Sequence, residues 1–247
     1  MTARTLPEEM HRTAEASRDE LAVALPAGAR GPMPAGLAGG EGHGVIKDQP
    51  WIQTYSGGAF PLLTPGPEHV HLRDISEALA KLCRFTGHTR WPYSVAQHSL
   101  YVADLVRAYG RIDAERYALL HDAHEAYVGD VATPMKRALD ALGRESAGRP
   151  TNPSASSALD RLVDPIDRAI HARFGLAWPP APDVQDIVKH CDLMALATER
   201  RDVLLDGPDW RMPLPSPAAE RIEQQPWHWE DAAERFHVRA FKLGLVR

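Results

Sequence analysis

Cysteine is scarce in this chain of 247 residues, which contains Cys83, Cys191 and no others. The two are far apart and form no CxxC pair, so the sequence supports neither a disulfide framework nor a zinc site built from thiolates. So few cysteines are typical of a reducing compartment, and we expect a cytoplasmic protein.

Long apolar runs are missing too. No stretch of about 18 or more apolar residues occurs, and Pro7, Glu8 and Glu9 follow Met1 too closely for an apolar segment of signal-peptide length. We therefore expect no transmembrane helix and no membrane partner.

The chain also has no excess of positive charge. It carries 28 Lys and Arg residues against 33 Asp and Glu residues, a formal net charge of -5. This balance argues against broad electrostatic binding of DNA or RNA, so we expect no nucleic-acid partner.

Strand signals are few. The one convincing candidate is residues 51–60, where the pair Gly57-Gly58 favours a short hairpin. Elsewhere the apolar residues recur at helical spacing. Residues 26–44 are rich in Gly, Pro and Ala, which indicates a flexible linker. The sequence thus predicts a flexible arm over 1–45 and an all-α helical domain over 46–247, with a small N-terminal hairpin.

Four candidate metal ligands stand out against this background: His98, His121, Asp122 and Asp192. Two imidazoles and two carboxylates suit a divalent transition metal that keeps open water positions. Such an ion lowers the pKa of its water and polarises a phosphoryl oxygen, which favours hydrolysis.

Glu125 lies near the central His-Asp pair in the sequence. A helix is expected over 113–127, where Glu125 would follow His121 by four residues and Asp122 by three, so that all three reach one cleft. His98 and Asp192 would come from two other helices, as metal sites in helical proteins require.

Several motifs occur in a recognisable order. They are Ser94-Val95-Ala96-Gln97-His98, then His121-Asp122, Glu125, Gly129-Asp130 and Thr133-Pro134-Met135-Lys136. Over roughly residues 70–205 this pattern resembles the HD-domain metal-dependent phosphohydrolases. Within them it is similar to the 5′-deoxynucleotidase-like branch and related phage nucleotide phosphohydrolases. The resemblance implies an HD-domain helical bundle.

The resemblance also implies roles for the metal ligands and the catalytic groups. His98, His121, Asp122 and Asp192 would bind one divalent ion, which could be Mn²⁺, Co²⁺, Zn²⁺, Fe²⁺, Ni²⁺ or Mg²⁺. Glu125 and Asp130 would orient or deprotonate the attacking water. Glu125 is the stronger candidate for the general base, and Asp130 could instead act on the leaving oxygen or cap the helix that follows.

Substrate contacts are implied for two further groups. Arg90-Trp91 matches an Arg-Trp-Pro element of the deoxynucleotidase branch, which implies phosphate contact by Arg90 and sugar or base contact by Trp91. Trp91 lies only seven residues before His98, closer than in the deoxynucleotidases. Lys136 carries over as a cation beside the phosphate. Lys189 precedes Asp192 by three residues, so it shares a helix face with that ligand and could also reach a phosphate.

The expected function is therefore that of a metal-dependent phosphohydrolase with a small-molecule nucleotide substrate, releasing phosphate from (deoxy)nucleoside 5′-monophosphates. One alternative is a deoxynucleoside triphosphate triphosphohydrolase, and another is a catalytically weak nucleotide-sensing HD module. Ala126 follows Glu125 where ppGpp hydrolases of this type have an aspartate. A homodimer is compatible with the sequence.

Overall fold

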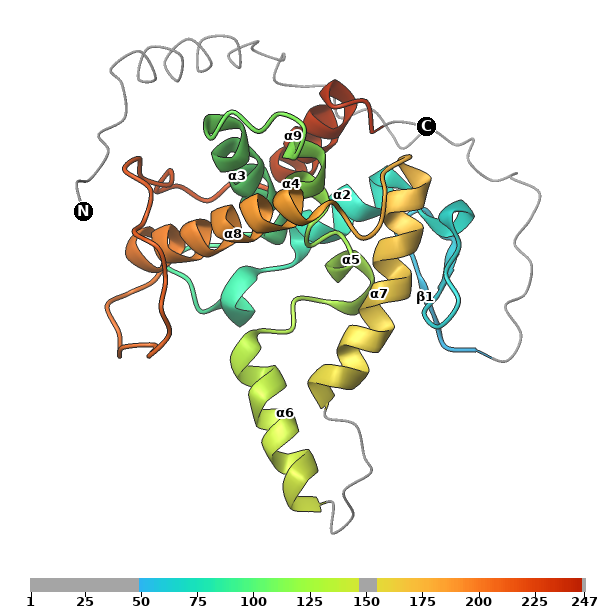
Figure 1. Cartoon of the computed structure of the whole chain (residues 1–247), viewed down its shortest axis with the longest axis horizontal. Coiled ribbons are helices and arrows are strands. Elements are labelled where there is room, and N and C mark those ends of the chain that lie inside the picture. The colour runs from blue at the N-terminus through green and yellow to red at the C-terminus, as the bar shows by residue number, and fades with distance from the viewer. Residues whose placement is uncertain (1–48, 147–154, 246–247) are drawn as a thin grey trace. The chain divides into compact units, whose positions relative to one another are not determined.

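The computed structural model describes residues 49–146 and 155–245, so the predicted arm over 1–45 lies outside the described residues. The prediction of an all-α domain with one small hairpin is confirmed (Figure 1). The helices are α2 (Leu72–Lys81), α3 (Val95–Ala108), α4 (Glu115–Leu120), α5 (Glu125–Val128), α6 (Thr133–Ser146), α7 (Ala155–Arg173), α8 (Pro182–Asp202) and α9 (Trp229–Lys242), with short 3-10 turns η1 (Pro67–His69) and η2 (Arg84–Gly87). None of the helices in the described ranges combines the length and apolar character that crossing a bilayer requires.

The hairpin pairs β1 (Trp51–Gln53) with β2 (Ala59–Pro61) in antiparallel register. Its turn needs the glycine at position 57, where φ is 85°, a left-handed value that costs glycine no steric strain. Phe60 on β2 is fully buried and stacks on Tyr127 of α5, with ring centroids 3.7 Å apart. The hairpin therefore supports the short helix that carries Glu125.

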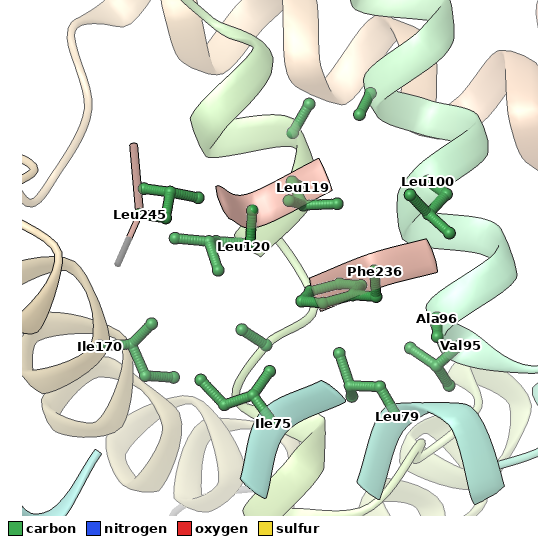
Figure 2. Packing of buried hydrophobic residues seen from close by; sticks show 14 of the residues in the cluster. Ile75, Leu79, Val95, Ala96, Leu100, Leu119, Leu120, Ile170, Phe236 and Leu245 are labelled. Atoms are coloured by element: carbon green, nitrogen blue, oxygen red, sulfur yellow. The ribbon is translucent and has the colours of Figure 1, made fainter. Parts of the chain in front are cut away.

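The hydrophobic core lies where α2, α3, α4, α7 and α9 meet, as Figure 2 shows. The labelled side chains of this core are Ile75, Leu79, Val95, Ala96, Leu100, Leu119, Leu120, Ile170, Phe236 and Leu245. Each of them is nearly or completely excluded from solvent. Burying each large apolar side chain stabilises the fold by about 1.5–3 kcal/mol before the entropy of ordering it is counted, so this core fixes the helices on which the polar site is built.

The beginning of α3 is fixed by local chemistry. The Ser94 hydroxyl accepts a hydrogen bond from the Gln97 backbone amide, and the Gln97 side chain accepts one from the Ser94 amide, which together form a capping box. Backbone bonds from Arg84 to Tyr93 (2.9 Å) and from Val95 to Leu82 (2.9 Å) join the preceding segment to this cap. They hold η2 against the first turn of α3.

The helix expected over 113–127 is interrupted, so that expectation was wrong in its continuity. Residues 121–124 form a turn between α4 and α5. The amides of Ala123 and Glu125 bond to carbonyls three residues back, on Leu120 and Asp122, at 2.9 and 3.0 Å. Bonding of this kind winds the chain at about three residues per turn. Residues three apart then lie above one another, so Asp122 and Glu125 still share one side of the chain.

Candidate metal centre

Three of the four candidate metal ligands form one compact group. Each of His98, His121 and Asp192 offers a ligand atom, and these atoms all lie within 4.8 Å of one another. His98 Nε2 is 3.2 Å from His121 Nε2 and 3.3 Å from Asp192 Oδ1. The residues come from α3, from the turn after α4 and from α8, so the fold brings distant parts of the chain together. This cluster could hold a metal ion.

Asp122, the fourth predicted ligand, borders the same space. Its Oδ2 atom lies 3.1 Å from His121 Nε2 and 3.5 Å from His98 Nε2. Arg84 approaches the same oxygen, at 3.6 Å. Asp122 is thus brought to the cluster, in contact with both imidazoles and with the Arg84 guanidinium.

Both imidazoles are oriented by contacts made through Nδ1. His121 Nδ1 lies 2.8 Å from the Ala118 carbonyl oxygen, to which it can only donate. His98 Nδ1 lies 2.6 Å from Glu199 Oε1, inside a fully buried pair. A hydrogen on each Nδ1 leaves the Nε2 lone pair directed at the cluster, which is the arrangement that metal-binding histidines use.

The electrostatics of the cluster favour a cation. Burial opposes a charge on Asp122, but the histidines and Arg84 hold the pKa of its carboxyl well below the usual range. Burial likewise opposes a charge on Asp192, yet contacts with His98 and His121 keep its pKa low as well. On His98, burial and Arg84 disfavour the proton, but Glu199 and Asp192 outweigh them and raise its pKa to about 9. The carboxylates around the cluster thus draw positive charge into the site, and a divalent ion fits this donor set.

The charged groups of the cluster affect the pKa values of Glu125 and Asp130. Burial, followed by the negative charges of Asp122 and Asp130, raises the pKa of Glu125 to about 9. Glu125 Oε2 is buried and has no hydrogen-bond partner among the described residues. Burial also raises the pKa of Asp130, while Arg84, His98 and Lys136 act against that rise. Two carboxyl groups with raised pKa values beside a cation site can accept and release protons.

The predicted substrate contacts are placed differently from one another. Lys136 on α6 is half-buried and influences the pKa of both Asp130 and His124, which places it near these two residues. Lys189 is largely exposed, and its Nζ atom lies 2.9 Å from Asp192 Oδ2. Lys189 therefore forms an ion pair with a candidate ligand.

Arg90 and Trp91 are not joined to the cluster by any polar contact recorded among the described residues. Arg90 has an exposed side chain, and its backbone amide bonds to the Val203 carbonyl. Trp91 is half-buried, and the Thr89 hydroxyl donates to its carbonyl. Their predicted roles in binding substrate remain predictions.

Two residues of the centre, Arg84 and Glu199, were not predicted from the sequence. The Glu199 side chain is fully buried and accepts from Arg84 NH2 at 3.1 Å as well as contacting His98. Glu199 follows Asp192 by seven residues on α8, which is two helical turns, so the shared face was a usable signal. Arg84 had no such signal, because its place depends on the backbone bonds that join η2 to α3.

The turn that carries Arg84 has unusual backbone geometry. Phe85 and Thr86 both have φ of 54°, a left-handed value that is uncommon for residues other than glycine. The guanidinium of Arg84 lies over the Phe85 ring, 5.4 Å from its centroid. Strained backbone persists where the surroundings enforce it, and such residues concentrate at functional sites.

Three bacterial proteins share significant sequence similarity with this chain. The uncharacterized protein YfdR of Escherichia coli (strain K12) is 34% identical over 177 residues, which span 71% of this chain and 85% of YfdR. The uncharacterized protein RCAP_rcc00048 of Rhodobacter capsulatus is 33% identical over 159 residues, 62% of this chain and 72% of that protein. The 5′-deoxynucleotidase YfbR of Salmonella typhi is 31% identical over 143 residues, 48% of this chain and 68% of YfbR. No family model matches the chain.

Proposed function

Because this chain belongs to the family that contains YfdR and the 5′-deoxynucleotidase YfbR, we propose that it is a metal-dependent HD-domain phosphohydrolase. Its substrates are (deoxy)nucleoside 5′-monophosphates, from which it releases inorganic phosphate. Similarity to YfbR supports nucleotide phosphohydrolysis at the level of the family, and the choice of monophosphates is the finer part of the proposal.

The observation that carries this proposal is the cluster of His98, His121 and Asp192, with Asp122 at its edge. These four side chains would hold one divalent ion. When bound, that ion would activate a water molecule and supply a positive charge that polarises a phosphoryl group. The remaining steps depend on the protein's own side chains.

Glu125 is the proposed acceptor of the proton from the attacking water. One oxygen of its carboxyl, Oε2, is buried and lacks a hydrogen-bond partner among the described residues, and the carboxyl has a raised pKa. A carboxylate with a raised pKa is a stronger base than an exposed one, and the positive charge of a bound divalent ion would favour its ionised form, which can accept the proton. Asp130 shares the same environment and is proposed to protonate the leaving sugar oxygen.

Cations around the cluster are proposed to bind the phosphate. Arg84 contacts both Asp122 and Glu199, and burial does not remove its charge because these carboxylates raise its pKa. Lys136 lies on α6 and, like Arg84, acts to lower the pKa of Asp130. A guanidinium and an ammonium beside a phosphoryl group would stabilise the charge that develops on it during the reaction.

Phosphate release from a panel of nucleotides tests the function. The panel contains deoxynucleoside and ribonucleoside 5′-monophosphates and the deoxynucleoside triphosphates, each with Mn²⁺, Co²⁺ or Mg²⁺. We expect turnover of monophosphates that EDTA abolishes. The substitution Asp192→Asn should reduce this turnover strongly, because loss of a ligand weakens binding of the ion. Release of triphosphate from the deoxynucleoside triphosphates would replace the monophosphate assignment, and no release from any member would refute catalysis.

A further inference from the structure

A cavity of about 180 Å³ adjoins the proposed catalytic groups, between α5, α6 and α7. Glu125 lines it together with the polar side chains of His124, Lys136 and Asp160. Val131 and Leu159 are part of its apolar wall. Glu125 thus belongs both to the surroundings of the metal cluster and to this cavity.

An apolar groove of about 310 Å³ continues from the cavity between α6 and α7. The two spaces share Val131, Lys136 and Leu159 as walls. Beyond these the groove is lined by apolar side chains such as Leu139 and Leu162. Polarity therefore falls along one continuous path that starts beside Glu125 and ends at Leu139.

His124 is held in the cavity wall by a buried carboxylate. Its Nδ1 atom lies 3.1 Å from Asp167 Oδ1, and Asp167 on α7 is nearly excluded from solvent. A carboxylate accepts the hydrogen on Nδ1, so Nε2 is the nitrogen available to a ligand. No hydrogen bond recorded among the described residues engages that atom.

We propose that the cavity and the groove together form a nucleoside-binding cleft. The sugar lies in the cavity, where His124 Nε2 bonds one of its hydroxyl groups, and the base lies along Leu139 and Leu159 in the groove. This order of charged, polar and apolar surroundings matches the phosphate, sugar and base of a nucleotide. The inference rests on the proposed function, because the phosphate must sit at the metal cluster for the sugar to reach His124.

Binding measurements test the cleft separately from catalysis. The probes are a deoxynucleoside 5′-methylenephosphonate, which cannot release phosphate, and inorganic phosphate, which has neither sugar nor base. Both are titrated calorimetrically into the Co²⁺-loaded full chain. Leu139 is 45% exposed, so Leu139→Glu can be made without emptying the core. We expect this variant to bind the phosphonate about tenfold more weakly, because a charge replaces an apolar contact with the base, and to bind phosphate as the wild type does.

Met135→Glu is the matched control, since Met135 is 54% exposed on the same helix and lines neither space. It introduces the same charge and should leave both affinities unchanged. Equal weakening of phosphonate binding by Leu139→Glu and Met135→Glu would mean that charge on α6, rather than the groove, is responsible, and would overturn the proposal.

His124 and Asp167 are tested as a pair. His124→Asn should weaken phosphonate binding by about tenfold, the value of one hydrogen bond, while metal content and phosphate binding stay unchanged. Asp167→Asn should produce a similar loss in the wild type and none in the His124→Asn background, because Asp167 acts through His124. Additive losses would show that Asp167 is merely structural.

The outcomes separate the cleft from the reaction. Binding of the phosphonate as expected, without hydrolysis of any nucleotide, would support the cleft and refute the proposed catalysis. Hydrolysis of nucleotides, with normal phosphonate binding by both Leu139→Glu and His124→Asn, would support the catalysis and refute the cleft. Failure of the wild type to bind the phosphonate more tightly than inorganic phosphate also overturns the cleft.

Discussion

Glu199 offers the sharpest test of how the site is supported, because it is not itself a candidate ligand. Its side chain is fully buried and accepts hydrogen bonds from His98 Nδ1 at 2.6 Å and from Arg84 NH2 at 3.1 Å. The change Glu199→Gln keeps the shape but removes the charge. A glutamine has one acceptor oxygen, so either His98 or Arg84 must face an amide group that can only donate.

The magnitude follows from these contacts. Removing one partner of a buried ion pair costs about 3–5 kcal/mol, but Arg84 keeps Asp122 nearby at 3.6 Å. We therefore expect the free energy of unfolding without metal to fall by about 2–3 kcal/mol, the scale of one charge-assisted bond. Loss of the group that orients His98 should also weaken metal binding by about 10–100-fold.

Two assays measure these effects. Competition with a chromophoric chelator gives the dissociation constant of the ion, and urea unfolding in EDTA gives the stability without it. Glu234→Gln is the control, because Glu234 is an exposed glutamate on α9. Wild-type metal affinity in the Glu199→Gln protein would refute the argument that His98 depends on Glu199 for its orientation.

Further changes should have distinct signatures. Glu125→Gln should keep the ion bound but lower kcat by about 10²-fold or more, as expected for loss of a general base; loss of the ion would instead make Glu125 a ligand. Phe60→Ala should lower the free energy of unfolding by about 3–5 kcal/mol, the usual effect of emptying a buried aromatic site, since Phe60 is fully buried against Tyr127; a loss below 1 kcal/mol in urea unfolding would contradict this packing. Asp202→Asn should cost about 1–3 kcal/mol, because the buried carboxylate accepts from the Ile222 amide at 3.0 Å. Burial opposes the charge of Asp202, but its hydrogen-bond and charged partners lower its pKa. The stabilisation by this carboxylate is therefore present at neutral pH and is lost as the pH falls through the lowered pKa. In urea unfolding from pH 7 to 3, the free energy of unfolding should fall less steeply for Asp202→Asn than for the wild type.

Local signals explain why the candidate ligands that gather in the cluster could be picked out from the sequence. Ser94 and Gln97 form a capping box that can be recognised from residue type and spacing alone, and it sets the helical phase of His98. The adjacent His121 and Asp122 join the same site as soon as their segment packs near the helix that carries His98. Such features depend on a few neighbouring residues, so they can be recognised from the sequence alone.

The parts that escaped prediction depend on tertiary contacts. The apolar pattern of 113–127 is compatible with a continuous helix, and the switch to bonds three residues back at Ala123 and Glu125 has no signature in residue type. Arg84 and Glu199 are charged residues that sequence reasoning assigns to the surface by default. The full burial of Glu199 and the low exposure of Arg84 are explained by their ion pair, in which each neutralises the other beside His98.

The convergence of α3, the turn after α4, and α8 on one cluster has a thermodynamic consequence. An ion that binds this cluster in the folded chain, and binds the unfolded chain weakly, must shift the folding equilibrium by mass action. At a free concentration one hundred times the dissociation constant the shift is about 2.7 kcal/mol. The melting temperature would then rank the metals by affinity without any knowledge of the substrate, and resistance to proteolysis in the cell would follow the supply of the preferred ion.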